Sequence, residues 1–228
     1  MTSARRPQPA TLLSVAQKTE RETEGRLPVL IAVIGLGGCF LALPGPLLLG
    51  PRWLIPAVVG ALLVPALIAH VTRQHRLDKF LGYGISVIVT LALTGSLALL
   101  LRSLPLKLAP PGALLRSAAI LWGTNVLVFA LWYWRLDAGG PREREARGEH
   151  KEGAFFFPQM MEGVPVANSR GWFPVFLDYL FIAFCTSTAF SPTDTPVLSR
   201  WAKVLTMVQS LISLLCIAVL ASRAIGLL

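Results

Sequence analysis

Charged side chains are scarce in this sequence. Asp, Glu, Lys and Arg together make up 14% of its 228 residues, whereas 54% of the residues are hydrophobic. Soluble globular domains carry about 25% charged residues. Five stretches of at least 18 residues contain no charged residue at all: 27–51, 53–72, 80–101, 117–134 and 204–222. This shortage of charge excludes an ordinary soluble domain.

Cysteine and histidine are also rare, with three residues of each type. Cys39, Cys185 and Cys216 fall inside apolar stretches, with no Cys-x-x-Cys pair and no histidine close to them in sequence. His70 and His75 are five residues apart, without carboxylates at the spacing of metal ligands. We therefore expect no disulfide, no metal and no cofactor.

Motifs for catalysis and for nucleic-acid binding are absent as well. No pattern of hydrolytic or redox chemistry is present, and Gly82 and Gly84 lack the Lys-Ser/Thr pair of a phosphate loop. The net charge of +9 comes from Lys and Arg in the termini and connecting loops, not from a basic stripe beside stacking aromatics. We expect neither an enzyme nor a nucleic-acid-binding protein.

The uncharged stretches themselves indicate membrane spans. A bilayer core about 30 Å thick needs about 20 mostly apolar helical residues. A sixth stretch, residues 172–190, is interrupted only by Asp178. The sequence therefore predicts an all-α, polytopic transmembrane helix bundle of about six spans. The expected partner of such a protein is the lipid bilayer, and the sequence leaves open whether it forms a homo-oligomer.

Four regions follow from this pattern. They are a polar N-terminal segment (1–26), a four-helix transmembrane region (27–135), a long polar and interfacial loop (136–171) and a C-terminal helix–turn–helix membrane module (172–228). Within the long loop, the alternating charges of residues 142–152 predict a solvated segment. Residues 155–161 are apolar but too short to span, so we expect them at the interface or folded back over the bundle. No internal repeat is evident, so the inverted-repeat signature of many transporters is missing.

Basic residues predict the orientation. With six crossings, 14 basic loop residues share a side with both termini and 6 lie on the other side. The positive-inside rule then places both termini in the cytoplasm. The cluster Trp132-Tyr133-Trp134 at the end of one stretch is typical of an aromatic belt at the interface.

Polar residues near the last two spans are the candidate site, because polar groups in hydrocarbon are costly. They are Asp178, Thr186, Thr188, Ser191, Asp194, Thr206, Gln209 and Ser213. Thr206, Gln209 and Ser213 follow one another at steps of three and four, which places them on one helical face. That face is either a seam between helices or the wall of an aqueous path. For Asp194 we expect a capping role before the last span.

The C-terminal segment 176–228, together with Phe157-Pro158 and the aromatic cluster at 132–134, resembles a family of bacterial inner-membrane proteins described only as a domain of unknown function. The similarity covers about the last 110 residues and, loosely, the layout of the spans. It implies a multi-pass protein of the bacterial inner membrane.

The same segment also looks like the pore helix, filter and inner helix of two-span potassium channels. The filter of those channels reads Thr-Thr-x-Gly-Tyr-Gly-Asp, where this chain has Thr-Ala-Phe-Ser-Pro-Thr-Asp at 188–194. Ser191 and Thr193 replace glycines whose backbone angles let the carbonyls point at the ion, so potassium selectivity is not expected. In such channels the pore segment enters from the outside. That arrangement would leave five spans here and place the loops with more basic residues outside, against the positive-inside rule.

These observations favour an integral inner-membrane protein that serves as a structural or small-transporter-like helix bundle. The alternative is an ion-channel-like protein with a degenerate, non-potassium-selective pore loop.

Overall fold

The computed structural model describes residues 27–72, 74–106, 110–147, 153–161, 173–188 and 195–225. Its helices are α2 (Leu27–Ala42), α3 (Leu54–Val71), α4 (His75–Leu106), α5 (Pro111–Leu136), α6 (Pro141–Arg147), α7 (Phe176–Thr188) and α8 (Arg200–Ile225). Three short 3₁₀ turns accompany them: η1 (Gly45–Leu47), η2 (Asp137–Gly139) and η3 (Pro158–Met160). The predicted all-α class is confirmed.

Three of these helices are long and apolar enough to cross a membrane, namely α4, α5 and α8. The helices α2, α3 and α7 are apolar as well but contain shorter apolar segments. At about 1.5 Å per residue, the 13 residues of α7 extend only about 20 Å. The prediction of six full spans is therefore not confirmed.

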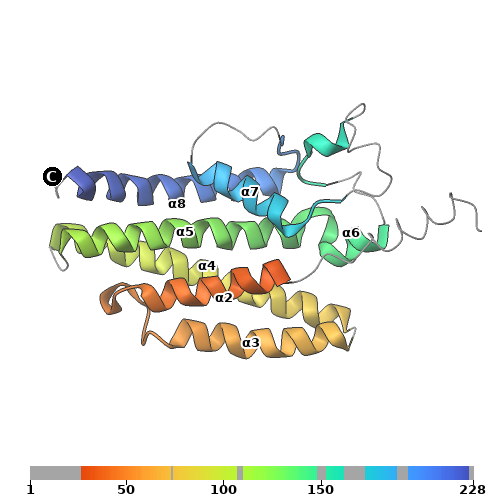
Figure 1. Cartoon of the computed structure of the whole chain (residues 1–228), viewed down its shortest axis with the longest axis horizontal. Helices are drawn as coiled ribbons and strands as arrows, with labels where there is room; N and C mark the ends of the chain where they lie inside the picture. Colours follow the sequence, from red (N-terminus) through yellow and green to blue (C-terminus); the bar gives the residue numbers. More distant parts are fainter. Residues whose placement is uncertain are drawn as a thin grey trace, which may run out of the picture.

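Helix α5 lies in the centre of the bundle and packs against α2, α4, α7 and α8 (Figure 1). In its most apolar window 61% of the residues are buried, compared with 28% in α8. Small residues such as Ala118 and Ala130 are fully buried on α5, and small side chains let neighbouring backbones approach closely. Helices α3 and α4 pair beside α2 and complete the other half of the bundle.

One end of the bundle gathers the start of α2, the end of α3, the start of α4 and the end of α5. Residues from these four segments line a common pocket together with residues of α6, so we name this the α6 end. Figure 1 shows the start of α2 and the end of α8 at opposite ends of the bundle.

Helix α7 enters the bundle at the α6 end and stops halfway along α5. Its first residue, Phe176, packs edge-on against Trp134 with ring centroids 6.2 Å apart. Near its last turn, Ser187 accepts a hydrogen bond from Trp122, twelve residues earlier on α5. The chain is back at the α6 end by Val197, which forms a β-bridge with Phe155.

Residues 153–161 cover the ends of three helices at the α6 end. The fully buried Phe155 ring contacts Tyr133 of α5, Tyr179 of α7 and Trp201 of α8, at centroid distances of 5.1, 6.2 and 6.3 Å. Main-chain bonds add to this, because Leu198 N–H donates to the Ala154 carbonyl at 2.7 Å. This segment is folded back over the bundle, as one of the two alternatives from the sequence proposed.

The short α7 leaves two expectations from the sequence unconfirmed, a full crossing at 172–190 and two termini on one side. The described part of this stretch, residues 173–188, does not reach the far end of the bundle, because α7 has 13 residues and the next described residues, 195–198, lie at the α6 end. The first described helix, α2, begins at the α6 end, and the last, α8, ends at the opposite end of the bundle. Six crossings would instead place these two helix ends on the same side.

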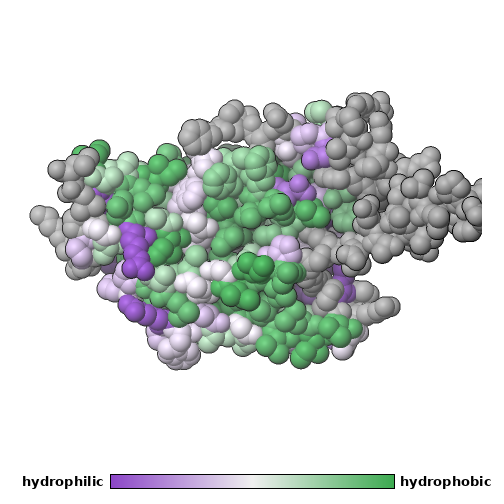
Figure 2. Space-filling view, viewed as in Figure 1, coloured by the Kyte–Doolittle hydropathy of each residue, from purple (hydrophilic) through white to green (hydrophobic). Residues whose placement is uncertain are grey.

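Large apolar side chains cover the outside of the bundle. Ile31 and Ile34 on α2, and Leu211 and Leu214 on α8, are each at least 60% exposed. Figure 2 shows hydrophobic residues over much of the face in view. Monomeric soluble proteins rarely expose apolar patches of more than a few hundred Å².

Replacing Phe155 tests the role of residues 153–161. We expect Phe155→Ala to lower the free energy of unfolding in detergent by about 3–5 kcal/mol, because the substitution removes a buried ring from a cluster of aromatic side chains. Phe156→Ala deletes the same ring at the neighbouring, half-buried position and should cost clearly less. Equal losses for the two variants would contradict an anchor through Phe155.

Candidate functional site

Gln209 is the centre of a buried polar cluster between α5, α7 and α8. Its side chain is fully buried, and its Nε2 donates to the Ala183 carbonyl at 2.7 Å and to the Ser187 hydroxyl at 2.8 Å. Its Oε1 accepts a hydrogen bond from the Tyr133 hydroxyl. One side chain of α8 therefore bonds both neighbouring helices.

The same cluster closes the C-terminal end of α7. The last four carbonyls of a helix have no partner within the helix, and leaving such a group unbonded in an apolar interior is costly. The Ser187 carbonyl accepts bonds from Trp122 Nε1, at 3.2 Å, and from the Ser213 hydroxyl. Asn125 Nδ2 donates to the Gln209 carbonyl at 3.1 Å. Side chains of α5 and α8 thus supply donors that α7 itself does not have.

The predicted polar face of α8 is only partly involved. Gln209 and Ser213 belong to the cluster, and Cys216 on the same face is fully buried. Thr206 is half-buried and donates its hydroxyl to the Lys203 carbonyl of its own helix at 2.9 Å. The contacts of Gln209 and Ser213 are those of a helix–helix seam.

The predicted residues of α7 make local bonds. Asp178 accepts a hydrogen bond from the Val175 N–H at 2.8 Å, which caps the start of the helix. Thr186 donates to the Ile182 carbonyl and Thr188 to the Cys185 carbonyl, both within α7. Ser191 and Asp194 lie outside the residues that the structure describes, so their predicted roles stay predictions.

Sequence reasoning missed Tyr133 and Ser187 as members of the cluster. Tyr133 was expected in an interfacial belt, yet both Tyr133 and Trp134 are buried in the bundle. The eight-residue spacing of Asn125 and Tyr133 places them on one face of α5 and was the available signal. Ser187 had no signal, because its role depends on where α7 ends.

A second buried cluster holds the α6 end together. Asp137 accepts bonds from the Ala154 N–H at 2.5 Å and from the Tyr179 hydroxyl at 2.6 Å. Arg144 is 1% exposed; its Nη1 donates to the carbonyls of Trp134 and Asp137 at 2.8 and 2.9 Å. Its guanidinium also lies over the Tyr179 ring, with Cζ 5.0 Å from the ring centroid.

The burial of Arg144 overturns the expectation that residues 142–152 are solvated throughout. The C-terminal end of a helix carries partial negative charge and unbonded carbonyls. Arg144 brings a positive group with several donors to that end of α5. Alternating charge in the sequence gave no sign of this contact.

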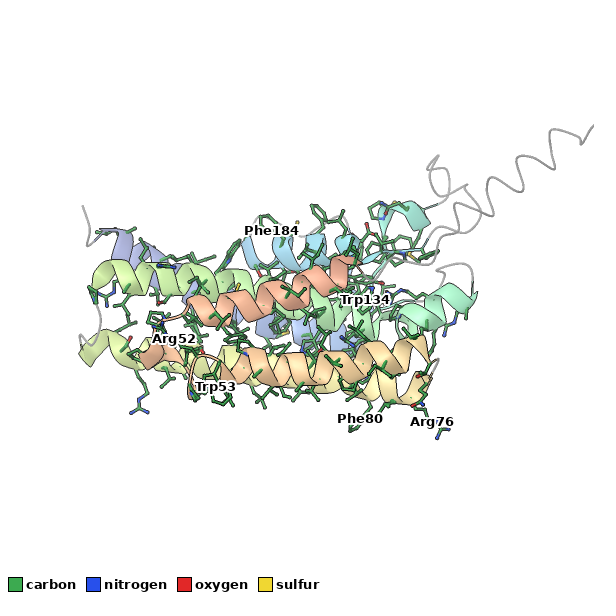
Figure 3. All side chains as sticks on the ribbon, turned by 60° about the horizontal axis from the view of Figure 1, so that its bottom comes forward. Arg52, Trp53, Arg76, Phe80, Trp134 and Phe184 are labelled. Atoms are coloured by element: carbon green, nitrogen blue, oxygen red, sulfur yellow. The ribbon has the colours of Figure 1, made fainter. Side chains whose placement is uncertain are left out.

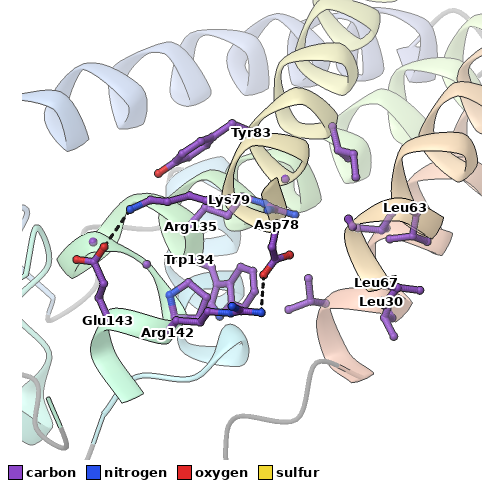
Figure 4. A pocket seen from close by; sticks show the side chains of 18 of the residues that line it. Leu30, Leu63, Leu67, Asp78, Lys79, Tyr83, Trp134, Arg135, Arg142 and Glu143 are labelled. Carbon is purple, nitrogen blue, oxygen red and sulfur yellow. Dashed lines mark hydrogen bonds and ion pairs between the residues drawn. The ribbon is translucent and has the colours of Figure 1, made fainter. Parts of the chain in front are cut away.

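A pocket of about 320 Å³ lies at the α6 end between α2, α3, α4, the end of α5 and α6 (Figure 4). Part of its wall is apolar and comes mainly from α2 and α3. The other part is charged and contains Asp78, Lys79, Arg135, Arg142 and Glu143. Two ion pairs join these residues, Arg142 to Asp78 at 3.1 Å and Lys79 to Glu143 at 3.0 Å.

Gly82 explains how Arg135 fits into this wall. A Cβ atom at Gly82 would lie 1.6 Å from Arg135 Nη1, so the guanidinium lies directly against the backbone of α4. The sequence suggested no role for Gly82 beyond the absence of a phosphate loop. Its role is to leave room for a charged group at the pocket.

Comparison with family models, with curated proteins and with solved structures found no match for this chain. The two resemblances drawn from the C-terminal sequence therefore stay predictions. Among the described residues, no three His, Cys, Asp or Glu side chains gather as potential metal ligands.

Replacing Gln209 tests the polar cluster. Gln209→Leu should lower stability in detergent by about 1–2 kcal/mol, because hydrogen bonds between membrane helices contribute about that much at most and several groups lose their partner. Thr206→Val on the same helix should change stability by less than about 0.5 kcal/mol. The measurement is thermal unfolding of the purified variants, and an unchanged Gln209→Leu would contradict a seam centred on this residue.

Proposed function

We propose that this chain is an integral membrane protein in which five helices cross the bilayer and α7 enters and returns. We further propose that it is a non-conducting helix bundle of the structural or small-transporter-like kind. The observation that carries the second proposal is the bonding near the end of α7, where side chains of α5 and α8 donate to the Ser187 carbonyl and Gln209 of α8 donates to the Ala183 carbonyl.

The surface supports a membrane location. The exposed leucine and isoleucine side chains on α2 and α8 are of the kind that lipid covers. Trp53, beside Arg52, is 64% exposed, and Phe80, close to Arg76, is 77% exposed. Figure 3 shows these two pairs toward different ends of the bundle. Aromatic and basic residues in such positions are typical of the two membrane–water interfaces.

Basic residues support one orientation. In a five-crossing topology Arg200 and Lys203 join the N-terminal side, so 16 basic loop residues lie on that side and 4 on the other. Six crossings gave 14 and 6. We therefore propose a cytoplasmic α6 end and a C-terminus on the opposite side of the bacterial inner membrane. This replaces the expectation of two cytoplasmic termini.

The closed end of α7 supports a non-conducting bundle. In transporters and channels, half-helices that end inside the membrane direct their terminal groups at the transported ion. Here the Ser187 carbonyl has two protein donors, and Ala183 accepts from Gln209. These bonds fix α7 in place and use the Ser187 and Ala183 carbonyls within the protein. A structural bundle needs no free carbonyls there, and a small-transporter-like bundle would bind its solute elsewhere.

A channel-like protein is the second candidate, because α7 is a half-helix that ends in the middle of the bundle, as the potassium-channel resemblance implies. The replaced glycines and the basic residues around the entrance of α7 argue against cation conduction. In a cation pore, Asp194→Asn would reduce the current while leaving the fold intact.

Labelling of single cysteines tests the topology, after Cys39, Cys185 and Cys216 have been replaced. The positions are Ala146 and Leu198 at the α6 end, and Arg52 and Ala224 at the far end. A membrane-impermeant thiol reagent on intact cells should label the two far-end cysteines, and the two α6-end cysteines only after permeabilisation. Labelling of Leu198→Cys on intact cells, without labelling of Ala146→Cys, would instead support six crossings.

Conductance separates the two candidate functions. We expect purified protein in a planar bilayer to give no current above that of a protein-free membrane, because the end of α7 is bonded within the bundle. A reproducible cation current that falls in Asp194→Asn would contradict the non-conducting bundle and favour the channel-like candidate.

A further inference from the structure

The pocket at the α6 end has an apolar wall and a charged wall, and a small water-soluble ion would contact only the charged one. Figure 4 shows Leu30, Leu63 and Leu67 on one side and Lys79 and Glu143 on the other. The volume of about 320 Å³ lies at the lower end of the range for small-ligand sites, about 300–1,000 Å³. An occupant that matches this lining carries charge at one end and hydrocarbon at the other.

We propose that this pocket binds the headgroup of a zwitterionic phospholipid with a primary ammonium, with the beginning of its acyl chains against α2 and α3. The proposal rests on the membrane location proposed above. In that location the α6 end lies at the level of lipid headgroups, so the charged wall faces headgroups and the apolar wall faces acyl chains.

The more exposed of the two ion pairs, Lys79 with Glu143, determines the headgroup chemistry. The side chains of Lys79 and Glu143 are 49% and 50% exposed. Exposed pairs of this kind contribute little, so exchanging them for a ligand costs little. A phosphate takes the place of Glu143 beside Lys79, and an ammonium takes the place of Lys79 beside Glu143.

The inner pair keeps the wall in place during such an exchange. Arg142 and Asp78 are 24% and 10% exposed, and their 3.1 Å contact joins α6 to the start of α4. Arg135, held against Gly82, adds a further positive group near the phosphate position. Lys79, Arg135 and Glu143 are thus the groups for the headgroup, while Arg142 and Asp78 stay paired behind them.

The pairing of Lys79 with Glu143 favours a headgroup that carries both charges over the other common headgroups. A purely anionic headgroup satisfies Lys79 but places its charge beside Glu143. A choline headgroup carries a quaternary ammonium that cannot donate a hydrogen bond to the Glu143 carboxylate. A primary ammonium donates three.

Binding of short-chain lipids to the detergent-purified full chain tests the proposal. The probes are dihexanoyl phosphatidylethanolamine, phosphatidylcholine and phosphatidylglycerol, with glycerophosphoethanolamine and inorganic phosphate as probes without hydrocarbon. Isothermal titration should give the tightest binding for the ethanolamine lipid, by about fivefold over the other two, as expected for one exposed charge contact.

Two variants assign the preference to the pocket. Glu143→Gln should remove the preference for ethanolamine over choline, and Lys79→Gln should weaken all three phospholipids. Arg52→Gln, at the far end of the bundle, is the matched control and should leave the affinities unchanged. Thermal unfolding verifies that each variant is folded. If Glu143→Gln does not fold, the weaker lipid binding expected for Lys79→Gln tests the proposal instead.

Three results overturn the proposal. They are equal binding of the three lipids, an ethanolamine preference that survives Glu143→Gln, and inorganic phosphate binding as tightly as the lipids, which would make this a site for free phosphate. If the cysteine labelling supports five crossings but the three lipids bind equally, the pocket proposal is refuted and the proposed topology stands. If cysteines at the α6 end and at the far end are labelled equally on intact cells, the membrane location itself is refuted, and with it the proposed function.

Discussion

A backbone carbonyl inside an apolar bundle needs a hydrogen-bond donor, and near the end of α7 the Ser187 carbonyl receives two from neighbouring helices. The donors are Trp122 of α5 and Ser213 of α8, and Gln209 of α8 adds a bond to the Ala183 carbonyl one turn earlier. Because two different helices provide them, the end of α7 can lie only at their junction. The packing of the last third of the chain depends on this requirement, since α8 contacts α5 along a face that also holds α7.

The entrance of α7 depends on a matching set of contacts at the α6 end. Asp137 bonds both the start of α7, through Tyr179, and the covering segment, through Ala154. Arg144 completes the end of α5 with a buried guanidinium, and such groups are tolerated only when bonded. Polar groups thus act at both the entry and the end of α7, and the aromatic contacts of Phe155 and Phe176 add to them at the entry.

The sequence predicted the helical class and the long helices α4, α5 and α8, because uncharged runs of about 20 residues have few alternatives. It favoured a crossing at 172–190 and kept re-entry only as part of the channel-like alternative. A run of 19 residues with a single Asp looks the same whether it crosses or turns back, and the deciding contact joins Trp122 to Ser187, 65 residues apart. The positive-inside count depended on six crossings, a number that the structure does not confirm.

Within the candidate site, the helical spacing of Gln209 and Ser213 identified two central residues from sequence alone. The members on α5 and α7 required the fold. The burial of Arg144 required it as well, because Arg144 stands in a charged segment whose pattern gave no sign of burial. The pocket was equally hidden, because Lys79 and Glu143 are 64 residues apart and meet only when α6 packs beside α4.

The central claim is that α7 enters and leaves the membrane on one side. Spin labels at Leu177, Phe184 and Leu198 test it, because all three side chains are exposed on the bundle. In vesicles of uniform protein orientation, a water-soluble relaxation agent confined to one side reports which labels that side can reach. The account predicts that Leu177 and Leu198 respond to the agent on the same side and that Phe184 is shielded from both sides. Responses of Leu177 and Leu198 to opposite sides would contradict it.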